Sequence, residues 1–311
     1  MLSRTQSGRP ALEHELLRDP DMGFEPAGAS VVRCLEHGAP WPLERWHYHD
    51  EYELQLITKT HGRAFVGDYI GHYAPGYLAL TAPRLPHNWI ANDTCAGGIA
   101  ARNLVVHFLD AELRQGMKIF PELSELGPLL DRARHGIEFF GISEPVRERF
   151  YRMKSAHGLE RLTEFTGLLN ELARCRDYRL LSTVQMECSE GQGSMTKINK
   201  VLDYLNENYA EDFSIGDVCA LVGMAEASFS RYFRRTTGNT LTDFVTRLRI
   251  AKACQLLEQS DNYVSGVCYE VGFRNIANFN RRFLEIKGVT PTQYRRQAST
   301  RSGKALESPS R

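Results

Sequence analysis

The pattern of hydrophobic and polar positions changes near residue 110. Before that point, short apolar or alternating runs are separated by Gly and Pro, a pattern typical of β-strands. The predicted strands are Val31–Leu35, Tyr52–Ile57, Arg63–Val66, Gly76–Leu80 and Asn103–Phe108. Many short strands at near-regular spacing predict a sandwich or a small barrel.

Beyond Asp110 the apolar residues recur at helical spacing, which predicts helices at Glu122–Arg134, Glu144–Ala156 and Leu159–Cys175. The last of these carries an apolar stripe of Leu159, Leu162, Phe165, Leu169 and Leu172. The stripe either packs on its own barrel or joins two copies of the chain, and we favour a homodimer contact. The polar, Gly- and Ser-rich run that follows predicts a flexible linker.

The C-terminal stretch from Val264 to Arg296 predicts two short helices joined by a tight turn. We expect Ser265 to cap the first helix, Gly272 to end it, and Asn275 to cap the second. Because the second helix is rich in Arg and Asn, the pair suits entry into the major groove of DNA.

The helix-turn-helix pattern occurs twice, since residues 214–238 repeat it with one residue fewer across the turn. Matching pairs are Cys219 and Cys268, Val222 and Val271, Gly223 and Gly272, Phe229 and Phe279, Arg231 and Arg281, Phe233 and Phe283, and Gly238 and Gly288. Between the copies, Thr240–Leu257 predicts one amphipathic linking helix.

These residues resemble the signature of the AraC/XylS family of bacterial transcription regulators. The residues in the family's register are Gly272, Phe273, Phe279, Arg281, Phe283, Gly288, Pro291 and Tyr294. The resemblance covers about Met195 to Arg296 and implies two helix-turn-helix units held by a linking helix. The chain departs from the family at Ala225, where a Ser cap is usual, so we expect the first recognition helix to start loosely.

The family register also implies which residues face double-stranded DNA. They are Ala227, Ser230 and Arg231 in the first unit, and Ile276, Ala277, Asn280 and Arg281 in the second. Arg can donate a bidentate pair to guanine, and Asn can do so to adenine. Alternatively, the two arginines contact phosphate or pair with residues of the fold.

Two motifs in the β-rich part resemble those of cupin barrels, which are a usual effector domain in AraC/XylS regulators. The first is the HxHxxxE run from His47 to Glu53, and the second is Ala74-Pro75-Gly76 followed by the run from Pro83 to Trp89. Residues two apart on a strand share a face, so His47 and His49 can point into one cavity.

The resemblance implies a metal set of His47, His49, Glu53 and His87. Three imidazoles and a carboxylate suit a divalent transition metal. The alternative is that they remain as polar lining without metal. His61, His72 and His107 are interpreted as ordinary surface or lining residues.

An effector pocket in the barrel needs apolar walls and a few converging polar groups. The candidate lining residues are Arg33, Trp46, Tyr52, Tyr69, Arg84 and Trp89. An Arg there would suit a sugar hydroxyl or the carboxylate of a sugar acid or an aromatic acid. Aromatic residues on strands can equally belong to the core.

Charge and cysteine content limit the class of protein. The formal net charge is zero, but residues 195–311 hold 17 Lys and Arg against 12 Asp and Glu, whereas residues 1–194 hold 21 against 26. This asymmetry places a nucleic-acid partner on the C-terminal part. Seven Cys without a CxxC pair argue against a zinc finger or a disulfide framework, and free thiols suit a reducing cytoplasm.

The fold class that these observations predict is α+β and multidomain. It combines an N-terminal cupin-like β-barrel with flanking helices and a C-terminal all-α double helix-turn-helix. We expect a frayed leader over residues 1–28, an effector-binding barrel over 29–110, a helical dimerisation region over 111–181, a linker over 182–195, the DNA-binding domain over 196–297 and a disordered tail over 298–311.

The predicted function is a cytoplasmic, nucleoid-associated transcription regulator and not an enzyme. A small molecule in the barrel would control it, and RNA polymerase would be a partner if it activates. One alternative is a constitutive regulator whose barrel only dimerises. Another is a metal-dependent cupin enzyme fused to a DNA-binding module.

Overall fold

The computed structural model describes residues 30–39, 46–92, 98–183 and 192–306. The predicted leader lies outside the described residues, as does most of the predicted linker. The chain divides into two compact units, one ending at Asn199 and one beginning at Lys200 that also takes residues 70–72. No helix among the described residues combines the length and apolar character that a bilayer span needs.

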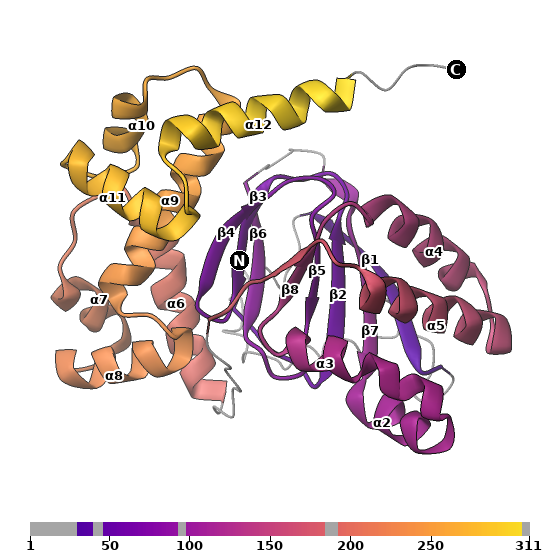
Figure 1. Cartoon of the computed structure of the whole chain (residues 1–311). Coiled ribbons are helices and arrows are strands. Elements are labelled where there is room, and N and C mark those ends of the chain that lie inside the picture. The colour runs from indigo at the N-terminus through magenta and orange to yellow at the C-terminus, as the bar shows by residue number, and fades with distance from the viewer. Residues whose placement is uncertain (1–29, 40–45, 93–97, 184–191, 307–311) are drawn as a thin grey trace, which may run out of the picture. The chain divides into compact units, whose positions relative to one another are not determined.

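The first unit is built on two sheets (Figure 1). An antiparallel six-stranded sheet has the order β1-β7-β2-β5-β8-β9, with β1 at Val32–Ala39, β7 at Ile99–Leu109, β2 at Glu51–Ile57, β5 at Leu78–Thr81, β8 at Ile137–Phe139 and β9 at Tyr178–Leu180. A three-stranded sheet has the order β4-β3-β6, with β4 at Tyr69–Tyr73, β3 at Gly62–Val66 and β6 at His87–Ala91. The five predicted strands are present, and closure into a cupin barrel stays a prediction.

Both faces of the central strand β2 are buried, and they differ in chemistry. Tyr52, Leu54 and Leu56 join the main hydrophobic core, where the ring of Tyr52 stacks on Phe108 at 5.0 Å between centroids. The alternate residues Glu51, Glu53 and Gln55 are exposed by only 1–3%. Because successive strand residues point to opposite faces, one side of β2 is apolar and the other is polar.

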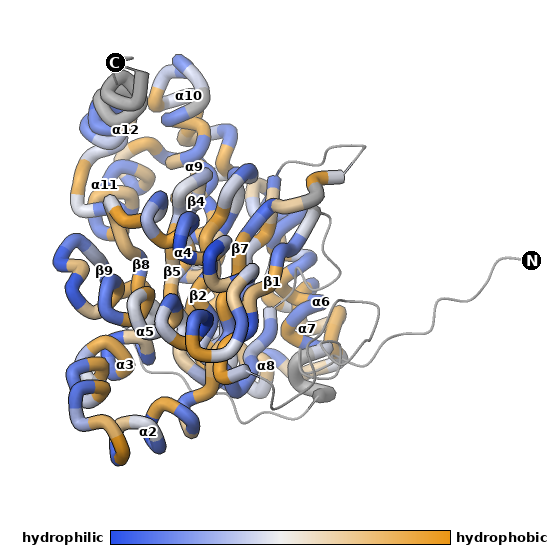
Figure 2. The backbone as a smooth tube through the Cα atoms, turned by 90° about the vertical axis from the view of Figure 1, so that its right-hand side faces the viewer, coloured by the Kyte–Doolittle hydropathy of each residue, from blue (hydrophilic) through white to orange (hydrophobic). Residues whose placement is uncertain are grey.

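Helices cover the apolar face of the six-stranded sheet. They are α2 at Asp110–Ile119, the 3-10 helix η2 at Pro121–Leu126, α3 at Gly127–Ala133, α4 at Ser143–Ser155 and α5 at Gly158–Arg174. Helix α4 packs on α5 and on strands β1 and β7. Hydrophilic and hydrophobic positions alternate along α2, as Figure 2 shows.

The predicted helical region of residues 111–181 therefore also contains two strands, β8 and β9, which extend the large sheet. The predicted stripe of α5 divides as well. Phe165, Leu169 and Leu172 are buried, whereas Leu159 and Leu162 are 77% and 41% exposed. The buried part of the stripe packs within the first unit, and the homodimer contact stays a prediction.

The C-terminal part of the described chain, from residue 192 on, is all-helical (Figure 1). Its helices are α6 at Gln192–Asn208, α7 at Ile215–Val222, α8 at Glu226–Thr237, α9 at Leu241–Gln259, α10 at Val264–Glu270, α11 at Ile276–Lys287 and α12 at Pro291–Leu306. The linking helix α9 packs against α8, α10, α11 and α12. Helix α12 continues to Leu306, past residue 298 where the disordered tail was predicted to start, and residues 307–311 lie outside the described residues. The predicted linker also ends earlier, because α6 begins at Gln192.

The turn of each helix-turn-helix is formed at the glycine that the sequence predicted. Gly223 and Gly272 have φ of 62° and 89°, a region that L side chains rarely adopt. At Gly272 a Cβ atom would also lie 2.4 Å from the backbone oxygen of Ala210, so only glycine fits there. The predicted cap at Ser265 was wrong, because Tyr263 takes the N-cap position of α10 and gives no side-chain hydrogen bond.

Candidate nucleic-acid interface and metal centre

The recognition helices α8 and α11 each bury one face and expose another. The buried face carries the predicted phenylalanines, which are Phe229, Phe233, Phe279 and Phe283, each 0% exposed. The predicted groove residues on the exposed face are Ala227, Ser230, Arg231, Ala277, Asn280 and Arg281. Ile276 is half-buried and packs against the core around α9, so it offers less surface to DNA than predicted.

The equivalent arginines Arg231 and Arg281 have different surroundings. Nη1 of Arg281 donates to Oε1 of Glu285 at 2.9 Å, and its Nη2 donates to Oδ1 of Asn278 at 2.9 Å. The side chain of Arg231 makes no hydrogen bond or ion pair with any residue that the structure describes. The guanidinium of Arg281 is therefore oriented by its own helix, whereas that of Arg231 is not.

Arg282 ties the second recognition helix to the linking helix. Its Nη2 lies 2.8 Å from Oδ1 of Asp243 at the start of α9, and its Nη1 lies 2.9 Å from Oε2 of Glu285. Sequence reasoning missed this link, because the two partners lie 39 positions apart along the chain. The contact joins α11 to the start of α9.

In the first unit the structure brings the four predicted metal ligands together. His47, His49, Glu53 and His87 each place one ligand atom within 4.8 Å of the others. They come from the segment before β2, from β2 and from the start of β6. The backbones of His47 and His87 also pair through two hydrogen bonds of 3.1 and 2.9 Å. Of the four, only His47 is not fully buried.

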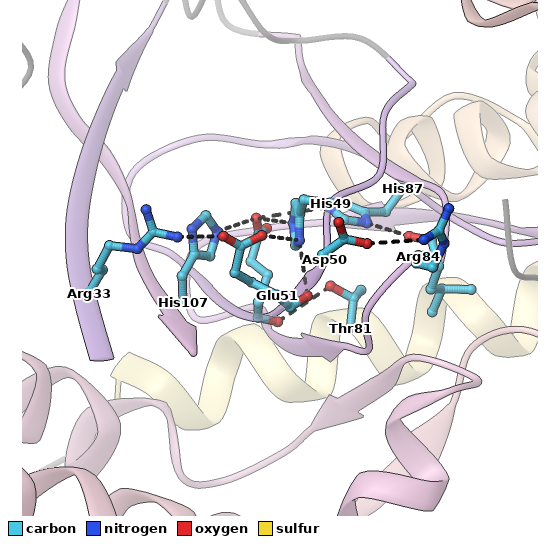
Figure 3. Close-up of polar contacts among 10 residues, drawn as sticks. Arg33, His49, Asp50, Glu51, Thr81, Arg84, His87 and His107 are labelled. Atoms are coloured by element: carbon cyan, nitrogen blue, oxygen red, sulfur yellow. Dashed lines mark hydrogen bonds and ion pairs between the residues drawn. The ribbon is translucent and has the colours of Figure 1, made fainter. Parts of the chain in front are cut away.

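Hydrogen bonds to the backbone fix the tautomers of two of these histidines. Nδ1 of His49 lies 3.0 Å from the carbonyl oxygen of Glu51, and Nδ1 of His87 lies 2.7 Å from that of Leu85. A neutral ring that donates from Nδ1 has a lone pair at Nε2. Nε2 of His87 is buried and has no hydrogen-bond partner among the described residues. Figure 3 shows His49, His87 and His107 in this region.

Both Nε2 atoms face the carboxylate of Glu53. Its Oε2 lies 3.2 Å from Nε2 of His49 and 3.8 Å from Nε2 of His87. Two lone pairs and a negative oxygen directed at one another repel unless a cation lies between them. Metal-binding histidines typically donate their other ring N–H to a backbone carbonyl, as these two do.

The protonation states favour the same ligand. Burial raises the pKa of Glu53, but the hydrogen bond from His107 and the neighbouring rings of His49 and His87 outweigh it and hold that pKa well below the ordinary range. Burial lowers the pKa of His87 to about 4, and His47 acts in the same direction. At neutral pH the site therefore holds a carboxylate and a neutral imidazole, which are the forms that bind divalent metals.

The predicted effector residues do not all share this region. Trp89 stands beside the site, with its ring centroid 4.8 Å from that of His87. Arg33 lies opposite His107 in the β1–β7 register and pairs with Glu51 at 2.5 Å. Trp46 is buried at 2% exposure just before His47.

The other three predicted effector residues serve the fold or face solvent. The hydroxyl of Tyr52 donates to Asp110 on the apolar, helix-covered side of the sheet. The hydroxyl of Tyr69 accepts a hydrogen bond of 2.8 Å from Arg179. Arg84 is exposed and lies 3.4 Å from Asp50. The predicted pocket is thus not assembled as one set.

Comparison with known proteins bears on the C-terminal part. A family description for a helix-turn-helix domain matches residues 218–297, which span α7 to the start of α12. An uncharacterised HTH-type transcriptional regulator of Staphylococcus aureus is 32% identical over 99 residues, covering 32% of this chain and 13% of the relative. The chain therefore spans only a small part of that relative.

A longer match extends into the first unit. The HTH-type transcriptional activator RhaS of Mannheimia succiniciproducens is 21% identical over 269 residues, covering 84% of this chain and 92% of the relative. Among solved structures, the DNA-binding domain of AdpA, a global transcriptional factor in complex with a target DNA, is 30% identical with a TM-score of 0.31 and covers 32% of this chain and 91% of that chain.

Proposed function

We propose that this chain, whose C-terminal part is a helix-turn-helix domain of the AraC type, is a sequence-specific DNA-binding transcription regulator. The observation that carries the proposal is the repeated unit, in which two recognition helices each bury a phenylalanine pair and expose polar groups. The relative named as a transcriptional activator supports activation as the direction of control. In that role RNA polymerase would be a partner.

Arg281 is the residue whose removal tests base reading. A bidentate contact to guanine contributes about 1–3 kcal/mol of discrimination, so Arg281→Ala should relax the preference at one base pair by roughly 10- to 100-fold. Selection of bound sites from random duplex DNA, followed by titration at fixed salt, measures this. Arg176→Ala removes an exposed arginine of the first unit and should leave the selected sites unchanged. Unchanged site preference in Arg281→Ala would reject base reading by this residue.

We propose further that the first unit senses a small molecule and that the chain works as a homodimer. The polar, buried side of β2 supports ligand binding, because buried polar groups are stable only when they have partners. The exposed Leu159 and Leu162 on α5 support a contact between two copies. Control of transcription then requires that the ligand bind two states of the protein with different affinity.

A second candidate function is metal binding by His47, His49, Glu53 and His87. It rests on the Nε2 atoms of His49 and His87, which face the Glu53 carboxylate while their Nδ1 atoms hold backbone carbonyls. A bound divalent metal would supply a positive charge that attracts an anionic group of an effector. The histidines hold their lone pairs toward that place, and Glu53 holds its negative charge there.

A thermal-shift screen separates these proposals. The intact protein would be tested against sugars, sugar acids, aromatic acids and divalent metal ions. A ligand that binds only the folded state raises the free energy of unfolding by about 2.7 kcal/mol at a concentration 100 times its Kd. A saturable shift by a metal that His49→Ala abolishes supports the metal site. A saturable shift by an organic acid or sugar identifies the effector class. No shift in any class would favour a constitutive regulator.

A further inference from the structure

The fifth polar group at the histidine site is His107, which the sequence alone placed among ordinary lining residues. It lies on β7 directly opposite Glu53 on β2, because the register of the two strands pairs them. Its side chain is 1% exposed, and its ring centroid lies 5.0 Å from that of His49. No spacing rule along the chain connects residues 54 positions apart, so only the strand register reveals the pair.

His107 contacts Glu53 in a different way from the other histidines. Its Nε2 lies 2.9 Å from Oε2 of Glu53, the shortest of the three imidazole contacts to that oxygen. Its Nδ1 is buried and has no hydrogen-bond partner among the described residues. No backbone carbonyl therefore draws the proton to Nδ1, as happens in His49 and His87, and the neutral ring carries its proton on Nε2.

The tautomer gives His107 a separate role. His49 and His87 present lone pairs to the site, whereas His107 presents an N–H that Oε2 of Glu53 accepts. A carboxylate oxygen has a second lone pair, so the bond from His107 leaves Glu53 able to bind a cation. A hydrogen bond to a ligating carboxylate fixes its orientation and makes it a better ligand.

We propose that His107 is a positioning residue that holds the carboxylate of Glu53 for a divalent metal ion bound by His47, His49, Glu53 and His87. The inference rests on the proposed metal site and adds a residue that the motif does not contain. His107 does not ligate the metal. It acts through Glu53, and its effect depends on a donor at the position of Nε2.

The test measures metal affinity in the intact protein with Zn²⁺ and Co²⁺ as probes. Loss of a hydrogen bond to a metal ligand weakens binding by roughly 10- to 100-fold, so we expect that loss in His107→Ala with unchanged stoichiometry. His107→Gln retains an N–H donor of similar reach and should restore most of the affinity. Competition against a chromophoric chelator gives the affinities, and the visible spectrum of bound Co²⁺ reports the ligand set.

Three further variants make the outcomes distinct. His157→Ala removes an exposed histidine and should bind Zn²⁺ as the unchanged protein does. His49→Ala shows what the loss of a true ligand does to the Co²⁺ spectrum. In a Glu53→Gln background, His107→Ala should add little further loss, because it acts through the Glu53 carboxylate. Melting in the absence of metal verifies that each variant is folded.

Each result decides the matter. Unchanged Zn²⁺ affinity in a folded His107→Ala protein would overturn the positioning role. A Co²⁺ spectrum of His107→Gln that changes as that of His49→Ala does would make His107 a ligand and also overturn it. An unchanged protein that binds neither ion would remove the proposed metal site and this inference with it, while the proposal of DNA binding would stand.

Discussion

The two helix-turn-helix units of the chain share a pattern but distribute their helix caps in opposite ways. In the first helix-turn-helix, the leading helix α7 starts with a capping box between Ser214 and Asp217. Its recognition helix α8 has Ala225 at the N-cap position and therefore no side-chain cap. In the second helix-turn-helix, the leading helix α10 has no side-chain cap. The recognition helix α11 starts at Asn275, whose side chain accepts from two backbone N–H groups.

The difference shows that duplicated units need not be equally ordered where they meet DNA. Base contacts in a helix-turn-helix come from the N-terminal part of the recognition helix. In α11 that part is fixed by Asn275, and Arg281 is oriented by Glu285 and Asn278. In α8 neither device is present among the described residues. We expect the second helix-turn-helix to discriminate between bases more strictly than the first.

The largest effect on stability should come from the buried phenylalanines, and it should be equal in the two helix-turn-helix motifs. Phe229→Ala and Phe279→Ala each remove a ring that is 0% exposed, and each should lower the free energy of unfolding by about 3–5 kcal/mol. Urea denaturation measures the loss. Phe120→Ala, at a site that is 60% exposed, is the control with little effect. A much smaller loss in one unit would mean that the two cores are not equivalent.

The next effect concerns the cap that only α11 has. Asn275→Ala should lower the free energy of unfolding by about 1 kcal/mol, because the N–H groups of Ala277 and Asn278 lose their acceptor. The same variant should weaken selection at the bases that the second unit contacts. Asn262→Ala changes an exposed asparagine before α10 and serves as the control. Equal stability of the two variants would show that the cap does not order α11.

The reverse change should make α8 more like α11. Ala225 has φ of −69° and ψ of 147°, the extended geometry of an N-cap, so Ala225→Ser can accept from the first turn without backbone strain. The expected gain is about 0.5–1 kcal/mol, with stricter site selection by the first unit. Ala227→Ser, two residues further along and inside the helix, should give no gain in stability. Thermal denaturation and site selection together measure both results.

The smallest effect should come from the ion pairs of Glu285. Arg281 and Glu285 are 63% and 43% exposed, and exposed pairs contribute at most about 1 kcal/mol. Glu285→Gln should therefore change stability little, yet it should lower the discrimination at the base that Arg281 is proposed to contact. Glu270→Gln is an exposed control in the leading helix. Discrimination that stays the same in Glu285→Gln would show that Asn278 alone orients the arginine.

The local sequence pattern predicted most of the C-terminal, helical part of the chain, because the residues that determine its structure lie close together in sequence. Gly272, Asn275 and the Phe279–Phe283 spacing lie within a few turns of one another, and each took its predicted role. The cap predicted at Ser265 was wrong because the helix begins one residue earlier, at Val264, and its N-cap residue Tyr263 gives no side-chain hydrogen bond. The helical extension beyond residue 297 was missed because its polar sequence has no apolar stripe.

The N-terminal, strand-rich part of the chain was less predictable, because its structure depends on which strands pair and in which register. The residues of the two motifs, His47, His49 and Glu53 from the first and His87 from the second, do lie together. Strand β6, which carries His87, was not predicted, since its five residues show neither clean alternation nor a long apolar run. His107 was classed with ordinary residues, because its contact with Glu53 depends on the register of β2 and β7. Tyr52 was expected in the pocket although it lies on the opposite face of β2.

The two buried faces of β2 have a consequence for the evolution of the gene. A codon inserted or deleted just before Tyr52 would shift the strand by one residue and exchange its faces. Glu53 would then enter the leucine-rich core, and Leu54 would enter the cluster of histidines. Neither side of this strand faces solvent, so neither side can tolerate such an error. We therefore expect natural length variation in the N-terminal part of the chain to fall in its loops and to spare the seven residues from Glu51 to Ile57.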